Sequence, residues 1–518
     1  MIESINLQNY KAFEDVTIPI QPLTILIGAN SVGKSSIIQM LMLLHQTAEE
    51  KLGLYSSALK IYGNYVNIGA FENLFKGKSV SKPLVVRIKM SSPDTFEMLK
   101  DCLHEYVDSF RSVASMTSTS DYWIEDDRFK TREDFRVFVE DLLPKLKKQI
   151  GEDKRRSELF QRHYGIPESI TKDGALDELM KGYDIRADIS QVESPDFVVS
   201  FELVVKSDKL KVSKFSVETG EGKRILLVES KTEKNMKVSS CYSLSASDQE
   251  EIVNGVNFNN TVFDLAEQDS YGRINPTTGS FLLEIAAELL RDLSDNFYED
   301  RLNYVSPLRA HPKRYYMLDK AKMTITLDTL DGDAIAEVLK ENKHVKKSVN
   351  EWFSKFGFNI DVKEFKEVIH HMNVTQNGLS LDITDVGFGI SQVLPIIIQG
   401  FLSNEESLTI IEQPEIHLHP KMQAELGDLF IDIVTKKRKK LIIETHSEYI
   451  LRRIRRRISE GKIDRDMVSI CLFHPKTKDA SAWVEHLEIG DKGAFHWPEE
   501  FYDGELTLDV TEFLKNQV

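Results

Sequence analysis

The 518-residue sequence has only three cysteines, Cys102, Cys241 and Cys471, and they show no paired spacing. An odd number of unpaired cysteines excludes a disulfide framework and a zinc ribbon, and it predicts a reducing, cytoplasmic setting. No apolar run approaches the ~20 residues that cross a bilayer. The first residues also lack a basic segment followed by an apolar one. Neither a membrane span nor a secretory signal is therefore expected.

Positive charge is also scarce, since 66 Lys and Arg face 82 Asp and Glu, which leaves a formal charge of −16. This balance excludes wrapping of nucleic acid over the whole surface. Two short basic runs, 436–440 and 452–457, reverse the balance locally. They are candidate phosphate contacts, although apolar residues at helical spacing in the second run also predict an ordinary helix with a solvated arginine face.

The apolar pattern predicts several α and β elements. The run 23–27 is continuously apolar, as in a buried parallel strand, and a mostly apolar helix follows it. Four β-rich segments predict an antiparallel meander, at 83–90, 197–206, 210–218 and 223–229. Residues 94–190 are helix-like and charged, which predicts a helical insertion. Residues 231–276 are rich in Ser, Asn and Asp, which predicts a loop or poorly ordered arm.

The segment GANSVGKSS, which begins at Gly28, matches the phosphate-binding pattern G-x-x-x-x-G-K-[ST] and lies between a predicted strand and a predicted helix. Backbone N–H groups and the helix N-terminus would face phosphate oxygens. Lys34 would neutralise the β and γ phosphates of ATP, and Ser35 would offer its hydroxyl to Mg²⁺. The nucleotide-binding residues expected here are Asn30, Ser31, Val32, Gly33, Lys34, Ser35 and Ser36.

The segment LTIIEQPEIHLH, residues 408–419, places acids directly after an apolar run. A phosphate-bound Mg²⁺ needs an acid at the end of a neighbouring strand, and Glu412 fits that position. The expected metal ligands are therefore Ser35 and Glu412. The alternative is an acidic strand end that simply faces solvent. The pair His417 and His419 has metal-like spacing, but no third ligand is evident, so a metal site there is not expected.

With these motifs, the sequence resembles ATP-binding-cassette ATPases of the chromosome-maintenance, RecF and overcoming-lysogenization-defect branch. LTIIEQPEIHLHP resembles its Walker B and D-loop segment, ETHSEYIL its histidine switch, and DVGFGISQVLP its signature loop. NYKAF and SPLRAHP look most like bacterial predicted ATPases that end in a C-terminal domain of unknown function. The resemblance covers about 1–93 and 300–518, so an insertion splits the nucleotide site.

The resemblance implies an α/β fold: a P-loop ATPase head of the ABC type, with a mixed sheet flanked by helices, an antiparallel β lobe and a largely helical insertion. The expected parts are 1–93 with the P-loop, 94–190 as the insertion, 191–300 as the β-rich lobe and arm, and 301–518 with the remaining motifs. Two heads would sandwich ATP in a homodimer or higher oligomer. Gly387, Gly389 and Ser391 would then approach the γ-phosphate held by the partner head, and His446 would sense it.

In that branch an acid follows the Walker B carboxylate and polarises the attacking water, whereas this sequence has Gln413. An amide can orient water but cannot accept its proton as a carboxylate does. Slow ATP hydrolysis is therefore expected, with Gln413, Glu415 and His446 as the candidate catalytic residues. Arg309, Lys313 and Arg314 in SPLRAHPKRYY either approach the nucleotide or a partner, or simply pack.

The function indicated is a slow ATPase that acts as a dimeric switch over a separate effector protein, a nuclease, in bacterial antiphage defence. Only about 70 residues follow His446, so a fused topoisomerase-primase type nuclease is not expected. Two alternatives stay open. One is a RecF-type repair ATPase that binds DNA directly, and the other is a nucleotide-dependent scaffold that does not hydrolyse ATP.

Overall fold

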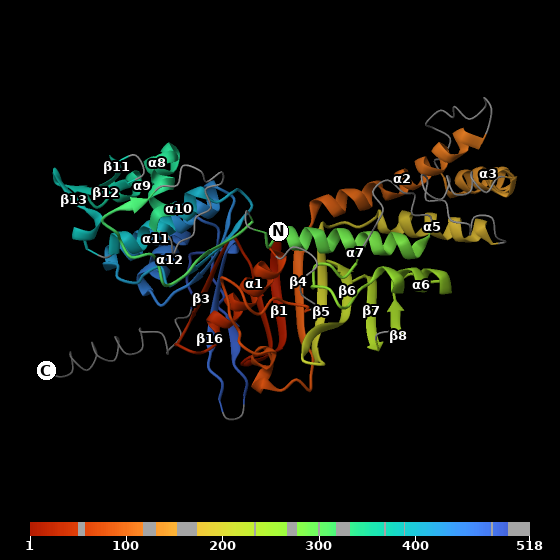
Figure 1. The fold of residues 1–518 in the computed structure, drawn as a ribbon, viewed down its shortest axis with the longest axis horizontal. Coiled ribbons are helices and arrows are strands. Elements are labelled where there is room, and N and C mark those ends of the chain that lie inside the picture. The colour runs from red at the N-terminus through yellow and green to blue at the C-terminus, as the bar shows by residue number, and fades with distance from the viewer. Residues whose placement is uncertain are drawn as a thin grey trace.

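The computed structural model describes residues 1–49, 57–117, 131–152, 174–232, 235–266, 277–298, 301–317, 332–366, 369–387, 389–477 and 480–495. The described chain forms two large sheets that lie near each other at the centre, with helices at both ends of the molecule (Figure 1). Short 3₁₀ helices occur at Phe71–Leu74, Lys76–Lys78, Ile383–Asp385 and Arg465–Met467.

The first sheet has seven antiparallel strands in the order β2-β1-β4-β5-β6-β7-β8. Their bounds are β1 (Ile2–Tyr10), β2 (Phe13–Pro19), β4 (Leu84–Ser91), β5 (Asp196–Lys206), β6 (Lys209–Thr219), β7 (Arg224–Thr232) and β8 (Asn235–Ser239). Alternate residues of β5 are buried, and the helix α7 (Thr278–Asp295) runs across these strands (Figure 1). The predicted meander is thus confirmed, and it joins the two N-terminal strands in one sheet.

The second sheet carries the P-loop and has the order β17-β16-β3-β15-β14-β9. Its strands are β3 (Leu23–Gly28), β9 (Leu302–Val305), β14 (Leu408–Glu412), β15 (Lys440–Glu444), β16 (Val468–His474) and β17 (Trp483–His486). All neighbours are parallel except β17. Every residue of β3 and of β14 is buried, as expected of strands covered on both faces.

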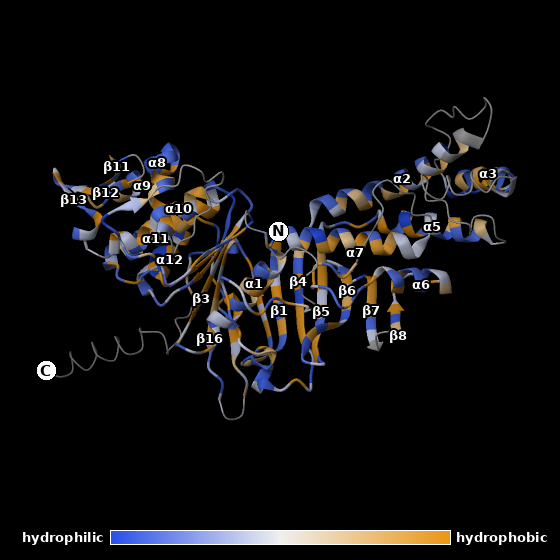
Figure 2. Ribbon diagram, in the orientation of Figure 1, coloured by the Kyte–Doolittle hydropathy of each residue, from blue (hydrophilic) through white to orange (hydrophobic). Residues whose placement is uncertain are grey.

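The two faces of this second sheet belong to two different cores. Leu26 points into the core that contains α1 (Lys34–Ala48), α7 and the antiparallel sheet. Its neighbours Ile25 and Ile27 point into a core built with the C-terminal helices. These helices are α8 (Gly332–Glu341), α9 (Lys343–Ser354), α10 (Gly389–Leu402), α11 (Pro420–Lys436) and α12 (Glu448–Ser459). Hydrophobic residues accordingly concentrate in the central strands (Figure 2).

A small antiparallel sheet packs near α8 and α9. Its strands are β10 (Tyr316–Met317), β11 (Phe358–Lys366), β12 (Ile369–Gln376) and β13 (Leu379–Asp382). The sequence predicts one strand over 362–374, and this is wrong, because β11 and β12 pair antiparallel in register, with Ile360 opposite Val374. No Gly, Pro, Asn or Asp lies between Val362 and Ile369, so the sequence contains no turn signal that shows where the chain reverses.

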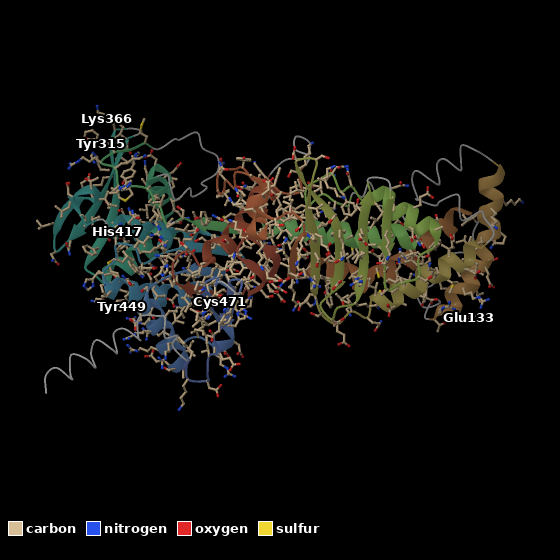
Figure 3. The ribbon with its side chains drawn as sticks, turned by 90° about the horizontal axis from the view of Figure 1, so that it is seen from below. Glu133, Tyr315, Lys366, His417, Tyr449 and Cys471 are labelled. Carbon is tan, nitrogen blue, oxygen red and sulfur yellow. The ribbon has the colours of Figure 1, made fainter. Side chains whose placement is uncertain are left out.

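The predicted helical insertion is present as α2 (Pro93–Thr117), α3 (Arg132–Glu152) and α5 (Ala175–Ile189). These helices share a small core of their own. The buried Arg186 of α5 connects this core to α7, because its guanidinium lies 4.1 Å from the Tyr106 ring centre and 3.9 Å from that of Phe281. The insertion forms one end of the molecule, since Glu133 on α3 lies at the opposite end from Tyr315 (Figure 3).

The expected loop over 231–276 is partly wrong, while 233–234 and 267–276 lie outside the described residues. The segment contains β8 and the helix α6 (Ala246–Gly255). A capping box begins α6, since Ser245 Oγ accepts from Asp248 N at 3.1 Å and Ser245 N donates to Asp248 Oδ2 at 2.8 Å. The pattern S-x-x-D signals such a helix start in the sequence.

The two basic runs are largely engaged within the chain. Four arginines of α12 form ion pairs: Arg452–Glu448, Arg453–Glu425, Arg453–Asp428, Arg456–Glu460, Arg457–Asp428 and Arg457–Glu460. Ile450, Leu451, Ile454 and Ile458 form the buried stripe of that helix. In the first run, Lys440 Nζ donates to Ile2 O at 2.7 Å and to Ile20 O at 3.1 Å. These contacts hold elements together and leave few cations for phosphate.

Lys439 is the clearest structural lysine. Its side chain is 2% exposed, and Nζ donates to Gly400 O and Ser403 Oγ, both at 3.0 Å. Burial, with a smaller effect of the Lys437 charge, lowers the pKa of Lys439 from 10.5 to about 8.

Because the folded state disfavours the Lys439 charge, its energetic cost is fully present below pH 8 and disappears as the pH rises towards 10.5. We expect the unfolding free energy of Lys439→Met, relative to wild type, to fall by on the order of 2 kcal/mol between pH 7 and pH 10. Urea denaturation of both proteins across that range measures the difference. A constant difference would contradict the lowered pKa.

No helix among the described residues is long and apolar enough to cross a membrane.

Candidate nucleotide site

The predicted P-loop begins at the end of β3 and leads directly into α1. Gly28 and Gly33 have φ values of 138° and 115°, which L side chains rarely adopt. A Cβ on Gly28 would meet Phe473 O at 2.6 Å, and one on Gly33 would meet Phe13 Cζ at 2.4 Å. The loop therefore requires glycine at both positions for conformation and for space. Asn30 and Ser31 are exposed at its tip, whereas Val32 is buried.

The NYKAF segment, residues 9–13, packs against this loop. Tyr10 Oη donates to Ser36 O at 2.9 Å, and the Phe13 ring lies against Gly33 and packs edge-on against Phe473. Both aromatic side chains are fully buried. The segment thus fixes the start of α1 and the curve of the P-loop, which its resemblance to the family did not explain.

Lys34 and Ser35 lie at the carboxyl edge of the parallel sheet. Lys34 is 3% exposed, and its Nζ donates to Gly28 O at 3.0 Å and Ala29 O at 2.7 Å. Ser35 Oγ donates to Glu444 Oε2 at 3.1 Å, and Lys34 Nζ lies 3.8 Å from Glu444 Oε1. Glu444, the last residue of β15, is therefore the acid that faces the P-loop.

Glu412 lies one strand further from the P-loop than the sequence predicts. The strand β15 lies between β3 and β14, so the expectation that Glu412 ends a strand next to the P-loop strand is wrong. Glu412 and Glu444 are register partners, and Tyr304 Oη donates to Glu412 Oε1 at 2.6 Å. The two acids thus form a pair at the sheet edge, with Ser35 on one side and Tyr304 on the other.

Burial controls the ionisation of this acid pair. It raises the pKa of Glu444 to about 7, with a further contribution from the Glu412 charge, and it also raises the pKa of Glu412. Burial lowers the pKa of Lys34, while Glu444 and Glu415 favour its charge. A cation near these acids would restore their ionisation. Hydroxyl and carboxylate oxygens are the ligands that Mg²⁺ prefers, so the donor set fits this ion.

Gln413 adopts a left-handed conformation with φ 46°, and its N–H donates to Glu444 O at 2.7 Å. Arg309 holds the same turn, because Nη2 donates to Glu412 O at 2.7 Å and to Gln413 O at 3.1 Å. Arg309 is 4% exposed, and burial lowers its pKa to about 10. Of the sequence alternatives for Arg309, the structure therefore shows packing against the Walker B turn.

Replacing Arg309 by Met is expected to destabilise the protein by about 1 to 3 kcal/mol, because two buried carbonyl oxygens lose a charged donor. The matched control is Arg314→Met, which removes an exposed ion pair with Asp385 and is expected to cost less than about 1 kcal/mol. Chemical denaturation of both variants measures the difference. Equal stability of the two variants would show that Arg309 does not hold the turn.

Glu415 connects the D-loop to the switch segment. Its Oε1 accepts from His446 N and its Oε2 accepts from Thr445 Oγ1, both at 2.7 Å. Both carboxylate oxygens are thus engaged by the segment that carries His446. The His446 Nε2 atom is buried and has no hydrogen-bond partner among the described residues. Burial, with a smaller effect of the Lys34 charge, lowers the pKa of His446, which favours the neutral ring.

The signature loop lies against the D-loop of the same chain. A Cβ on Gly389 would meet His417 O at 2.8 Å, whereas one on Gly387 would meet no heavy atom of the described residues within 4 Å. Ser391, in the first turn of α10, is 7% exposed. His419 begins α11, where its Nδ1 accepts from Lys421 N at 3.2 Å. Figure 3 labels His417 on this half of the molecule.

Sequence reasoning missed three residues of this site: Glu444, Tyr304 and Thr445. The sequence pattern could have identified Glu444, because Glu444 ends an apolar run as Glu412 does. Tyr304 carries none, since its role depends on β9 lying beside β14.

A family model described as an AAA ATPase domain matches residues 1–451. The chain belongs to this family. Its P-loop therefore belongs to a nucleotide-binding ATPase domain, and the predicted fold class, α/β of the P-loop ATPase type, is confirmed. No curated protein matched the sequence.

The chain is also similar to solved structures. The SMC head domain from Thermotoga maritima has 8% identity and a TM-score of 0.33 over 94% of this chain and 99% of that chain. The Smc head domain with an extended coiled coil bound to the C-terminal domain of ScpA, from Pyrococcus furiosus, has 11% identity and a TM-score of 0.34 over 99% of both chains. These scores are too low to support a conclusion about function.

Proposed function

We propose that this ATPase is a dimeric switch that closes on ATP and hydrolyses it slowly. The observation that carries the proposal is Gln413, which follows Glu412 where an acid would accept the proton of the attacking water. Glu415 does not readily replace that acid, because both of its oxygens already accept hydrogen bonds from residues 445 and 446. Bound Mg²⁺ would supply positive charge that stabilises the phosphates as charge moves during hydrolysis.

The residues of the chain have distinct roles in this proposal. The P-loop backbone and Lys34 bind the phosphates, and Gln413 orients the attacking water without taking its proton. The His446 backbone N–H donates to Glu415, the Lys34 charge affects the His446 ring, and the buried ring Nε2 has no hydrogen-bond partner in the part of the chain that the structure describes. That nitrogen is suited to report whether the γ-phosphate is present. Slow turnover then keeps the ATP-bound state long enough to signal.

Gly387 and Gly389 of the signature loop, together with Ser391, would approach the nucleotide of the partner head. Gly387 is suited to this because no atom of the described residues lies within 4 Å of its side-chain position. By resemblance alone, the switch would control a separate effector protein, a nuclease, in antiphage defence. A DNA-binding repair function is less well supported, since Lys439, Lys440 and most α12 arginines are engaged inside the chain.

Molar mass measured by light scattering tests the switch. With ATP and Mg²⁺ the mass is expected to reach twice the 59.3 kDa of one chain, and with ADP it is expected to stay at one. Gly387→Arg should fold and yet remain monomeric, because the added side chain has room in the monomer but blocks the partner. Ser380→Arg on the exposed β13 is the matched control and should dimerise. A mass independent of nucleotide would refute the proposal.

A further inference from the structure

The acid nearest the expected magnesium ligand Ser35 is Glu444. Ser35 Oγ lies 3.1 Å from Glu444 Oε2 and 3.4 Å from Oε1, and the Glu444 side chain is 4% exposed. Glu444 ends the strand directly next to β3, since it pairs with Leu26 in register. Its position at the P-loop follows from the strand order and does not depend on one side-chain rotamer.

The separation of these oxygens matches the geometry of a magnesium ion. Mg²⁺ takes near-ideal octahedral coordination at ~2.0–2.1 Å, so two adjacent ligand oxygens lie about 3.0 Å apart. The Ser35 to Glu444 distance of 3.1 Å agrees with this value. The same distance is that of the hydrogen bond that Ser35 donates to Glu444, so an ion between the two oxygens would replace this hydrogen bond without separating them further.

Glu412 is less well placed for direct contact. Neighbouring strands lie about 4.8 Å apart, so Glu412 is two strand spacings from β3, whereas Glu444 is one. One oxygen of Glu412 also accepts the short hydrogen bond from Tyr304. This arrangement suits an acid that reaches the ion through water or orients the ligating acid.

We propose that Glu444, together with Ser35, binds the Mg²⁺ ion of the nucleotide directly. Glu412 then reaches the ion through water or orients Glu444. The inference rests on the proposed ATP-dependent function and deepens it by assigning the metal ligand. It also gives a reason for an acid at the end of a buried strand, where an uncompensated charge is costly.

A different role for Glu444 is that of a counter-ion for Lys34. The 3.8 Å separation is at the outer limit of an ion pair, and Lys34 Nζ already donates to two carbonyl oxygens. The two roles predict different results. A counter-ion affects nucleotide binding whether or not metal is present, whereas a ligand controls the affinity for the metal itself.

The test uses the full chain with a non-hydrolysable ATP analogue and Mn²⁺ as the spectroscopic probe, with free Mn²⁺ measured by electron paramagnetic resonance. Glu444→Gln is expected to weaken Mn²⁺ binding to the nucleotide complex at least tenfold. In EDTA the same variant should bind the analogue as well as wild type or better, because one negative charge near the phosphates is gone. Glu406→Gln, two residues before the start of β14 and so at the edge of the sheet opposite Glu412, is the matched control and should bind Mn²⁺ like wild type.

Glu412→Gln is measured in parallel. Mn²⁺ affinity of Glu444→Gln within twofold of wild type, with a large loss in Glu412→Gln, would overturn the assignment. If Glu444→Gln does not fold, Glu444→Asp replaces it. That variant keeps the charge but withdraws the carboxylate, so it should weaken Mn²⁺ binding several-fold, and unchanged binding would overturn the assignment too.

The failure of this inference is distinguishable from failure of the switch. Normal Mn²⁺ affinity in Glu444→Gln, with ATP-driven dimerisation intact, would refute Glu444 as the metal ligand but would still support the dimeric switch. Weakened Mn²⁺ affinity in Glu444→Gln, in a protein that never dimerises with ATP, would support Glu444 as the metal ligand and refute the dimeric switch. A wild-type protein that binds neither nucleotide nor Mn²⁺ would overturn both.

Discussion

Lys34→Ala is expected to weaken ATP binding about 100-fold. A hydrogen bond to a charged group contributes ~1.5–3 kcal/mol, and each ~1.4 kcal/mol is a factor of ten in affinity. The loss is placed at the upper end because Glu444 and Glu412 lie beside the loop, and without the lysine their negative charge would repel the triphosphate. Titration calorimetry in the presence of Mg²⁺ measures the affinity.

The control for Lys34→Ala is Lys76→Ala, which removes a surface lysine that pairs with Glu14 at 2.9 Å. Its affinity for ATP should equal that of wild type within error. If Lys34→Ala bound ATP as tightly as this control, the loop GANSVGKSS would not be the phosphate site, and the functional proposals would fail with it.

Gln413→Glu is expected to raise the rate of ATP hydrolysis tenfold or more. The change places a carboxylate where, in the proposed mechanism, the amide orients water, and a positioned general base typically contributes ~10²–10⁴-fold. The new acid would lie near the carboxyls of Glu412 and Glu444, and like charges raise the pKa of a carboxyl, which favours proton acceptance. Steady-state phosphate release measures the rate, and wild-type turnover is expected below about 1 per second.

The control at this position is Gln413→Asn, because Asn tolerates the left-handed conformation that Gln413 adopts with φ 46°. It keeps an amide but shortens it, so it should not accelerate hydrolysis. A Gln413→Glu protein no faster than wild type, or a wild type already much faster than about 1 per second, would show that position 413 does not limit turnover.

Much of the local structure was predictable because it depends on neighbours in sequence. The strand at 23–27, the P-loop and the helix after it are all where the pattern predicts them. The helical insertion and the antiparallel strands are likewise present. The failures also have local causes: no Gly, Pro, Asn or Asp marks a chain reversal between Val362 and Ile369, and the helix α6 is short and polar, so its composition resembles a loop.

The site was predictable only in part. Sequence patterns indicated Lys34, Ser35 and the acidic turn at 412–415, but they placed Glu412 one strand too close to the P-loop. They also gave Arg309 no definite role, although the structure shows it holding the carbonyls of that turn. Both results depend on which strands become neighbours, and a linear pattern does not contain this information.

The sequence by itself determined the phosphate loop, since glycine at 28 and 33 and the residues between them specify a backbone that few other segments adopt. Only the tertiary structure decided which acid meets that loop. The strand β15 lies between β3 and β14, and strands are separated by about 4.8 Å, so one position in the sheet order puts Glu444, and not Glu412, beside Ser35.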